Sequence, residues 1–215
     1  MNIIVAAATI LEIEPLLETA NLPPYKLLIT GIGSAAAVYS LTRQVLDEKP
    51  DLIIQAGMAG SFKQASMGNV YAVEKDRFAD MGVEENGTWR DIFDMNLADP
   101  NEGPFFNGWL NNLYPFVRKL NLPLATSITI NEITTNPSRI DLFKSKYEAD
   151  LESMEGAALH FVGIGERVPF VQLRAVSNIV GERDKSKWQM MDAIKNLNNE
   201  LIKLLHFFAA APFPA

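Results

Sequence analysis

The chain has 215 residues, of which 48% are hydrophobic and 21% charged, so it can bury the core of one α/β domain and is not intrinsically disordered. A net charge of −7 argues against a nucleic-acid-binding surface, which would need a basic patch. Cysteine is absent and the only histidines are His160 and His206, which argues against a disulfide framework, a thiol nucleophile and a histidine metal site. No cofactor is expected.

The first seventeen residues lack a basic stretch and already contain Glu12 and Glu14, which is unlike a signal peptide. No apolar run approaches the ~20 residues that a membrane span needs. We therefore expect a cytoplasmic protein that does not bind membranes.

Short apolar runs and helical patterns alternate through the first third of the chain. Ser34 is placed as a helix N-cap, and Pro50 ends that helix. The expected elements are strands at 3–9, 27–30, 51–55 and 70–74, a short helix or turn at 10–19 and a helix at 34–48.

Residues 79–108 differ from their surroundings, because they are rich in Gly, Asn, Asp and Pro with four aromatic residues between them. A loop of this length in a small domain is usually functional or disordered. The aromatic residues Trp89, Phe93, Phe105 and Phe106 favour a packed loop that covers a substrate.

The alternation continues to the C-terminus. It predicts a helix from Leu110, a strand at 124–130, a polar loop at 129–137 followed by a helix to Tyr147, helices at 151–164 and 187–208, and a strand at 169–177. This order indicates an α/β sandwich, and without a linker or repeat we expect one domain over residues 1–215.

The sequence from Gly31 to Ala36 fits the G-x-G-x-x-A dinucleotide fingerprint. That fingerprint also needs an acidic residue at the end of the next strand, which here ends in Gln55-Ala56-Gly57. A dehydrogenase is therefore disfavoured. The alternative is a tight turn whose backbone approaches a ligand or a packed helix.

Two charged residues stand inside apolar patterns. Arg174 interrupts a buried strand and shares a side with Val176 and Asn178 by alternation, so it is either a ligand contact or a structural ion pair. Glu155 falls on the apolar stripe of the helix predicted from Leu151, although an N-terminal Glu favoured by the helix dipole is the simpler alternative.

Five motifs in a fixed order resemble the nucleoside phosphorylase and nucleosidase superfamily, in its branch of methylthioadenosine/S-adenosylhomocysteine nucleosidases. They are the first strand with Glu12, TGIGSAAA at 30–37, AGMAG at 56–60, SMEGAA at 153–158 and RAVSN at 174–178. Within that branch, segments 78–87, 104–108 and 177–184 look most like futalosine hydrolases. The resemblance implies a three-layer α/β/α sandwich around a mixed sheet, a small nucleoside as substrate, and a homo-oligomer.

The resemblance also implies roles for single residues. Glu12 would be the base that activates water, Arg174 would hold that water and the ribose, and Glu155 would bind the 2′- and 3′-hydroxyls above Met154. Asn178 would belong to the catalytic residues and hydrogen-bond the purine. The implied substrate-binding set also contains Gly57, Met58, Thr129, Ile130, Asn131, Ile133 and Ser177.

Asn178 stands where adenine-specific relatives have Asp. A protonated Asp suits the 6-amino group and N7 of adenine, whereas an Asn amide can donate to O6 and N7 of hypoxanthine. The resemblance thus implies hydrolysis of futalosine to hypoxanthine and dehypoxanthine futalosine, on a route to menaquinone. A second departure is Met58, where the adenine branch has Ser.

Three alternatives stay open at this point. An adenine-type nucleosidase is disfavoured by Asn178, and a purine nucleoside phosphorylase would need cationic groups around a phosphate. From another class, a non-catalytic nucleoside-binding protein is disfavoured because Glu12, Glu155 and Arg174 occur together.

Overall fold

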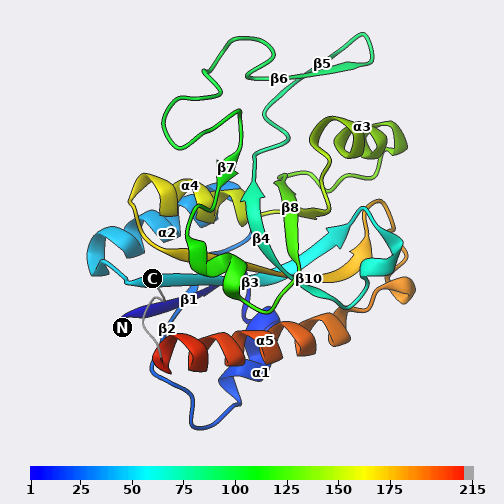
Figure 1. Ribbon diagram of the computed structural model, residues 1–215. Coiled ribbons are helices and arrows are strands. Elements are labelled where there is room, and N and C mark those ends of the chain that lie inside the picture. Colours follow the sequence, from blue (N-terminus) through cyan, green and yellow to red (C-terminus); the bar gives the residue numbers. More distant parts are fainter. Residues whose placement is uncertain (211–215) are drawn as a thin grey trace.

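An eight-stranded mixed sheet runs through the centre of the computed structural model, which describes residues 1–210 (Figure 1). Its strand order is β10-β4-β8-β9-β3-β1-β2, with β7 beside β4. The strands are β1 (Ile3–Ala7), β2 (Lys26–Ile29), β3 (Leu52–Ser61), β4 (Val70–Asp76), β7 (Leu110–Asn111), β8 (Leu124–Thr129), β9 (Leu151–Ser153) and β10 (Phe170–Ile179). A separate hairpin consists of β5 (Gly82–Glu85) and β6 (Thr88–Asp91).

Part of the sheet closes into a ring, because β3 pairs with both β9 and β10 while β4 and β8 complete the circuit between them. β3 and β10 run parallel, with Arg174 opposite Gly57 and Asn178 opposite Gly60. The ends of both strands therefore lie side by side, which is where open α/β sheets place their ligands.

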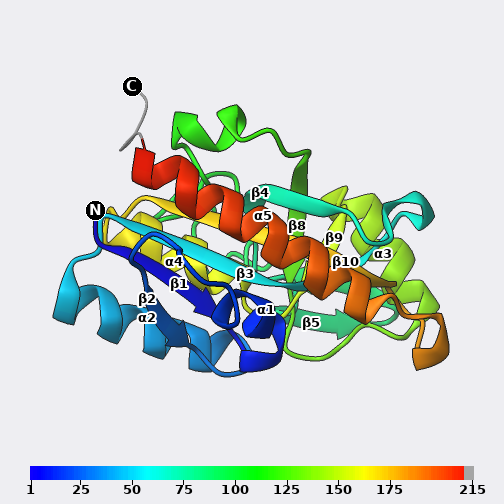
Figure 2. The ribbon, with the colours of Figure 1, turned by 90° about the horizontal axis from the view of Figure 1, so that it is seen from below.

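Helices cover both faces of the sheet, as the three-layer prediction requires (Figures 1 and 2). The helices are α1 (Glu14–Leu17), α2 (Ser34–Glu48), α3 (Pro137–Tyr147), α4 (Gly156–Gly165) and α5 (Met190–Ala210), with 3-10 turns η1 (Ile10–Ile13), η2 (Gln64–Ser66), η3 (Pro115–Lys119) and η4 (Lys185–Lys187). α5 and α1 bury Leu16, Leu197 and Leu201 against one face. α2 and α4 bury Leu41 and Leu159 against the other.

The helix predicted from Leu110 is wrong. Leu110 and Asn111 instead form β7, and only the 3-10 turn η3 follows. The side chain of Asn112 donates to Phe170 O at 2.8 Å and accepts from Tyr114 N at 3.1 Å, which holds the backbone in a turn. Pro115 then supplies no N–H for a helix that would continue from Leu110.

The helix predicted over 151–164 begins five residues late. Leu151 and Glu152 pair with Ser127 and Ile128 of β8 on one side and with β3 on the other, so this apolar start is a strand of the ring. α4 begins at Gly156, with Glu155 at its N-cap position. Leu151 and Glu155 therefore do not share an apolar helical stripe, contrary to the prediction. At α2 likewise, the N-cap is Gly33 and not Ser34.

Residues 79–108 are packed, although they contain a hairpin that the sequence did not predict. Trp89 Nε1 donates to the hydroxyl of Tyr147 at 3.1 Å, and Phe105 contacts both Phe93 and Phe161 of α4. The exposed Phe106 is the exception among the four aromatic residues. These contacts tie the segment to α3 and α4.

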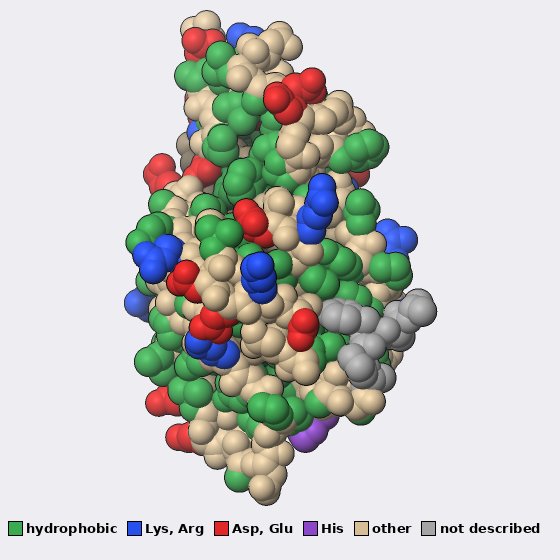
Figure 3. All heavy atoms as spheres, turned by 90° about the vertical axis from the view of Figure 1, so that its left-hand side faces the viewer, with side chains coloured by type: hydrophobic (Ala, Val, Ile, Leu, Met, Phe, Trp, Pro, Cys, Tyr) green, Lys and Arg blue, Asp and Glu red, His purple; other side chains and the backbone are tan. Residues whose placement is uncertain are grey.

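On the face in Figure 3, Lys and Arg side chains lie interspersed with Asp and Glu and do not gather into a basic patch. Among residues 1–210, no helix combines the length and apolar character that a bilayer crossing requires. The same residues hold no cluster of His, Asp and Glu suited to a metal ion.

Asn198 of α5 is a buried polar residue that fixes the turn after β1. Its Oδ1 accepts from Leu16 N at 3.1 Å, and its Nδ2 donates to Glu12 O at 2.9 Å and Ile194 O at 2.7 Å. A helix on one face of the sheet thereby positions η1, which carries Glu12.

Replacing Asn198 by Leu keeps the branching of the side chain but leaves two buried backbone groups, Leu16 N and Glu12 O, without partners. We expect Asn198→Leu to lower the free energy of unfolding in urea by about 2–4 kcal/mol. The matched variant Asn199→Leu, at an exposed neighbouring position, should change it by less than about 0.5 kcal/mol. Equal stability of the two variants would show that the Asn198 contacts carry no net free energy.

Candidate functional site

A cavity of about 390 Å³ opens where β1, β3, β9 and β10 end. This volume lies within the range of small-molecule sites. Eight predicted site residues line it, namely Glu12, Met58, Ile130, Ile133, Met154, Glu155, Ser177 and Asn178. The residues from 79 to 108 do not contribute to its described lining, so the prediction that they cover a substrate stays a prediction.

Glu12 lies in η1, directly after β1, with 7% of its surface exposed. Its Oε1 accepts from Met58 N at 3.2 Å, and its Oε2 accepts from Thr9 N at 3.0 Å and Thr9 Oγ1 at 3.3 Å. These donors orient the carboxylate at the cavity wall. The exposed Glu14 belongs to α1 and does not line the cavity.

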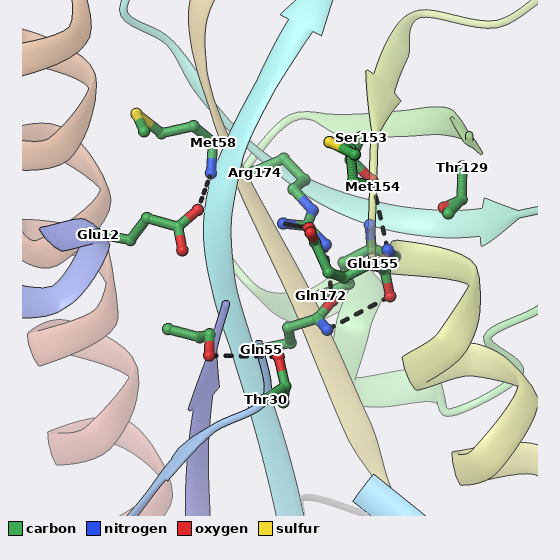
Figure 4. A network of polar contacts seen from close by, with 12 residues as sticks. Glu12, Thr30, Gln55, Met58, Thr129, Ser153, Met154, Glu155, Gln172 and Arg174 are labelled. Carbon is green, nitrogen blue, oxygen red and sulfur yellow. Dashed lines mark hydrogen bonds and ion pairs between the residues drawn. The ribbon is translucent and has the colours of Figure 1, made fainter. Parts of the chain in front are cut away.

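Arg174 is 1% exposed and is not one of the residues that line the cavity. Its Nη2 donates to Gln55 Oε1 at 2.7 Å, and its Nη1 is 3.9 Å from Glu155 Oε2 (Figure 4). The buried ion pair with Glu155 agrees with the structural interpretation of Arg174, whereas its contact with a ligand stays a prediction.

Gly57 makes room for the guanidinium. It is paired with Arg174 across β3 and β10, so their side chains would point to the same face. A Cβ at Gly57 would collide with Arg174 Nη1, and Glu12 Oε1 lies 3.2 Å from the same point. Gly57 does not line the cavity, so its contact with the substrate stays a prediction; the structure shows that this glycine leaves room for Arg174 beside Glu12.

Glu155 stands at the start of α4 with 6% of its surface exposed. Burial raises the pKa of its carboxyl, while Arg174 and the N–H of Gly33 oppose that rise. Gly33 N donates to Glu155 Oε1 at 3.0 Å from a backbone with φ of 90°. The Gly31–Ala36 motif is thus a tight turn that presents an N–H to a site carboxylate.

Thr129 does not reach the cavity, contrary to the prediction for this residue. It is fully buried behind α4, where its Oγ1 accepts from Ala157 N at 2.7 Å and donates to Asp76 Oδ1 at 2.9 Å. Gln172 donates to the other oxygen of Asp76 at 3.0 Å, and burial raises the pKa of Asp76 to about 6. This network holds the end of α4 that carries Glu155.

Asn131, predicted to bind the substrate, likewise does not line the cavity. Its Oδ1 accepts from Ser34 N at 3.0 Å and its Nδ2 donates to Asp80 Oδ2 at 3.1 Å, so it caps α2 and does not line the cavity. The neighbouring Ile130 and Ile133 supply the apolar wall that was predicted for this loop.

A bulge in β10 turns two consecutive polar residues toward the cavity. The register against β3 shifts between Val176 and Asn178, so the alternation expected from Arg174 onward breaks at Ser177. Ser177 Oγ donates to Asn178 Oδ1 at 2.8 Å, and Asn178 Nδ2 donates to Ile179 O at 3.0 Å. One N–H of the Asn178 amide remains for a ligand.

Glu152 is a cavity residue that the sequence analysis missed. It was assigned to a helix, whereas in β9 its side chain lines the cavity with 7% of its surface exposed. Oε1 accepts from Thr134 N at 3.2 Å, and Oε2 is buried with no hydrogen-bond partner in the described chain. Burial raises the pKa of this carboxyl to about 7. The available signal was an acidic residue directly after the apolar Leu151 and two residues before Met154.

The arrangement suits hydrolysis of a polar small molecule. Glu12 offers an ionisable oxygen to a water molecule, and Glu155 offers acceptors for a diol. Arg174 lies between them and compensates their charge. The cavity lining contains Glu12, Glu152, Glu155 and Glu182 but a single cation, Arg183, among the residues described.

Comparisons with known proteins agree with this geometry. A family model described as the phosphorylase superfamily matches residues 21–210. Futalosine hydrolase of Streptomyces coelicolor is 29% identical over 191 residues, covering 84% of this chain and 78% of that protein. Futalosine hydrolase of Thermus thermophilus is 29% identical over 182 residues, covering 83% and 80%.

The fold matches a solved structure of 5′-methylthioadenosine/S-adenosylhomocysteine nucleosidase from S. pneumoniae. Its TM-score is 0.78 at 18% identity, covering 95% of this chain and 98% of that one. At this identity the likeness concerns the fold alone, and it confirms the nucleoside phosphorylase-like sandwich.

The raised pKa of Glu152 predicts a pH-dependent stability difference. A carboxyl whose pKa is higher in the folded chain stabilises below its unfolded pKa, and this contribution is lost as pH rises to about 7. Glu152→Gln, which stays neutral, should therefore gain up to about 3 kcal/mol of unfolding free energy relative to the native chain between pH 4 and pH 8. Urea denaturation at several pH values measures this difference in unfolding free energy, with the exposed Glu166→Gln as the control variant. A gain that does not change with pH would refute the raised pKa.

Proposed function

The chain belongs to the phosphorylase superfamily, and from this premise we propose that it hydrolyses the N-ribosyl bond of futalosine and releases hypoxanthine. The broader class, an N-glycosyl hydrolase acting on a nucleoside, rests on relatives named as hydrolases and nucleosidases. The remaining product would be dehypoxanthine futalosine, on a route to menaquinone. We further propose that the enzyme is cytoplasmic and forms a homo-oligomer.

The observation that carries the proposal is the pair of buried carboxylates, Glu12 and Glu155, on either side of Arg174 (Figure 4). Cleavage of an N-ribosyl bond builds positive charge on the ribose, as glycoside hydrolysis does. Glu155 would bind the 2′- and 3′-hydroxyls with the ribose over Met154. Glu12 would take a proton from water as the oxygen bonds to C1′ and the bond from C1′ to the purine nitrogen breaks.

The cavity chemistry favours water over phosphate as the second reactant. A phosphorylase needs cationic or N–H groups around a phosphate dianion. Here four carboxylates line the described cavity, and Arg174 is already engaged by Gln55 and Glu155. Phosphate placed beside Glu12 would meet like charge.

Asn178 supports a 6-oxopurine as the leaving base. Its Oδ1 accepts from Ser177, so its amide presents a donor to the cavity and not an acceptor. A donor matches O6 of hypoxanthine, whereas the 6-amino group of adenine would need an acceptor at the same place. This supports futalosine over methylthioadenosine as the substrate. Met58 N donates to Glu12 Oε1, but the Met58 side chain offers no hydroxyl to water or ribose, unlike the Ser of the adenine branch.

Glu12→Gln keeps the size of the side chain but removes the base. We expect kcat to fall by about 10²–10⁴-fold with KM nearly unchanged, measured as hypoxanthine release from futalosine. The matched variant Glu14→Gln, two residues away on the surface, should retain the native rate. A native rate in Glu12→Gln would remove Glu12 from the mechanism.

Asn178→Asp exchanges a donor for a carboxylate that repels O6 and, when protonated, can satisfy adenine. We expect the ratio of kcat/KM for inosine over adenosine to fall by about tenfold or more. Asn178→Ser, which keeps a donor, should preserve the direction of the preference. An unchanged ratio in Asn178→Asp would place base choice elsewhere.

A further inference from the structure

Four residues between β10 and α5 line the cavity without a role in the proposed function, and we call the segment 181–188 the rim loop. They are Gly181, Glu182, Arg183 and Trp188. Asn178 and Glu155 are assigned to the purine and the ribose. Futalosine also carries a benzoate at the end of its 5′ side chain, and a carboxylate in a protein site needs cationic or N–H donors. Within the described lining, only the rim loop contains a cation.

The rim loop is tied to the strand end that carries the proposed purine contact. Trp188 Nε1 donates to Glu182 O at 3.1 Å, which closes the loop on itself. Directly after the loop, Gln189 N donates to Ser177 O at 2.8 Å, in the bulge that presents Asn178. The loop therefore holds a fixed place beside the proposed purine contact.

The two acidic side chains of the rim loop have partners within the loop. Glu182 Oε2 lies 2.7 Å from Lys187 Nζ. Asp184 Oδ1 accepts from Ser186 N at 3.0 Å and from Ser186 Oγ at 2.7 Å. Neither carboxylate pairs with the arginine that stands between them in the sequence.

That arginine, Arg183, is exposed and makes no ion pair within the described chain. Its guanidinium carbon lies 5.5 Å from the centre of the Trp188 ring, which is a cation–π distance. A planar guanidinium can hold a carboxylate through two parallel N–H donors, and an indole can pack against an aryl group. The pair therefore offers both kinds of contact that a benzoate needs.

The charge of the cavity makes this cation necessary for an anionic substrate. Glu12, Glu152 and Glu155 line the cavity, and the chain as a whole carries a net charge of −7. A carboxylate that approached the cavity elsewhere would meet like charge, which costs binding free energy. Arg183 is the place in the described lining where a negative end is attracted.

We propose that Arg183 binds the carboxylate at the 5′ end of the substrate, so that the enzyme selects nucleosides whose 5′ substituent is anionic. The inference rests on the proposed function and adds the far end of the substrate to it. Because Arg183 is exposed, solvent and salt screen the contact, so the selection should be moderate and should weaken with ionic strength.

Futalosine and its carboxamide, in which a primary amide replaces the benzoate carboxylate, test the contact because they have nearly the same size and differ by one charge. At low ionic strength we expect kcat/KM of the native chain to be about tenfold higher for futalosine. In Arg183→Gln this ratio should fall to about one. Lys185→Gln removes an equal charge from the same loop outside the cavity lining, and it should keep most of the native ratio.

Equal kcat/KM for the two compounds in the native chain would overturn the inference, and that measurement needs no variant. An unchanged ratio in Arg183→Gln would also overturn it, as would an equal fall in Lys185→Gln, which would assign the preference to the general charge of the loop. Failure of the proposed function looks different. If futalosine is hydrolysed but the ratios do not depend on Arg183, only the inference falls; if neither compound is hydrolysed, both fall.

Discussion

A buried guanidinium is the constraint on which the site depends. Arg174 is the largest side chain that the described fold encloses almost completely, and a buried charge is tolerated only when it is paired and hydrogen-bonded. Gln55 and Glu155 supply partners for Nη2 and Nη1, Nε has no hydrogen-bond partner in the described chain, and Gly57 supplies the space. Because β3 and β10 run parallel and adjacent, the burial of Arg174 between them also constrains where the strand ends and the carboxylates of Glu12 and Glu155 lie.

Two sets of contacts hold the carboxylates on either side of Arg174. Asn198 reaches from α5 to the turn that carries Glu12, and the network of Asp76, Thr129 and Gln172 supports the helix end behind Glu155. Only a few of these groups touch the cavity. The rest convert a flexible turn and a helix end into fixed positions, which is what orientation of water and ribose requires.

How far the sequence could predict this depends on the kind of signal. Glu155 was found because an acid in an apolar run is unusual, yet the helix assumed for it was wrong, since short apolar runs do not separate strand from helix. The same error concealed Glu152, because no local pattern shows that residues 151–153 complete a ring of strands. The order of the motifs that contain Glu12, Glu155 and Arg174 did predict the sandwich. Tertiary contacts determine the bulge at Ser177, and the sequence does not show them. The same holds for the packing of Gly57, Thr129 and Asn131.

The account centres on water attacking the ribose in a carboxylate-lined cavity, and oxygen labelling tests this most directly. Futalosine is incubated with the intact chain in H₂¹⁸O without phosphate, and the masses of the products are determined by mass spectrometry. The account predicts hypoxanthine together with a sugar product that carries one ¹⁸O atom. Release that requires added phosphate, with a sugar 1-phosphate as product, would contradict it.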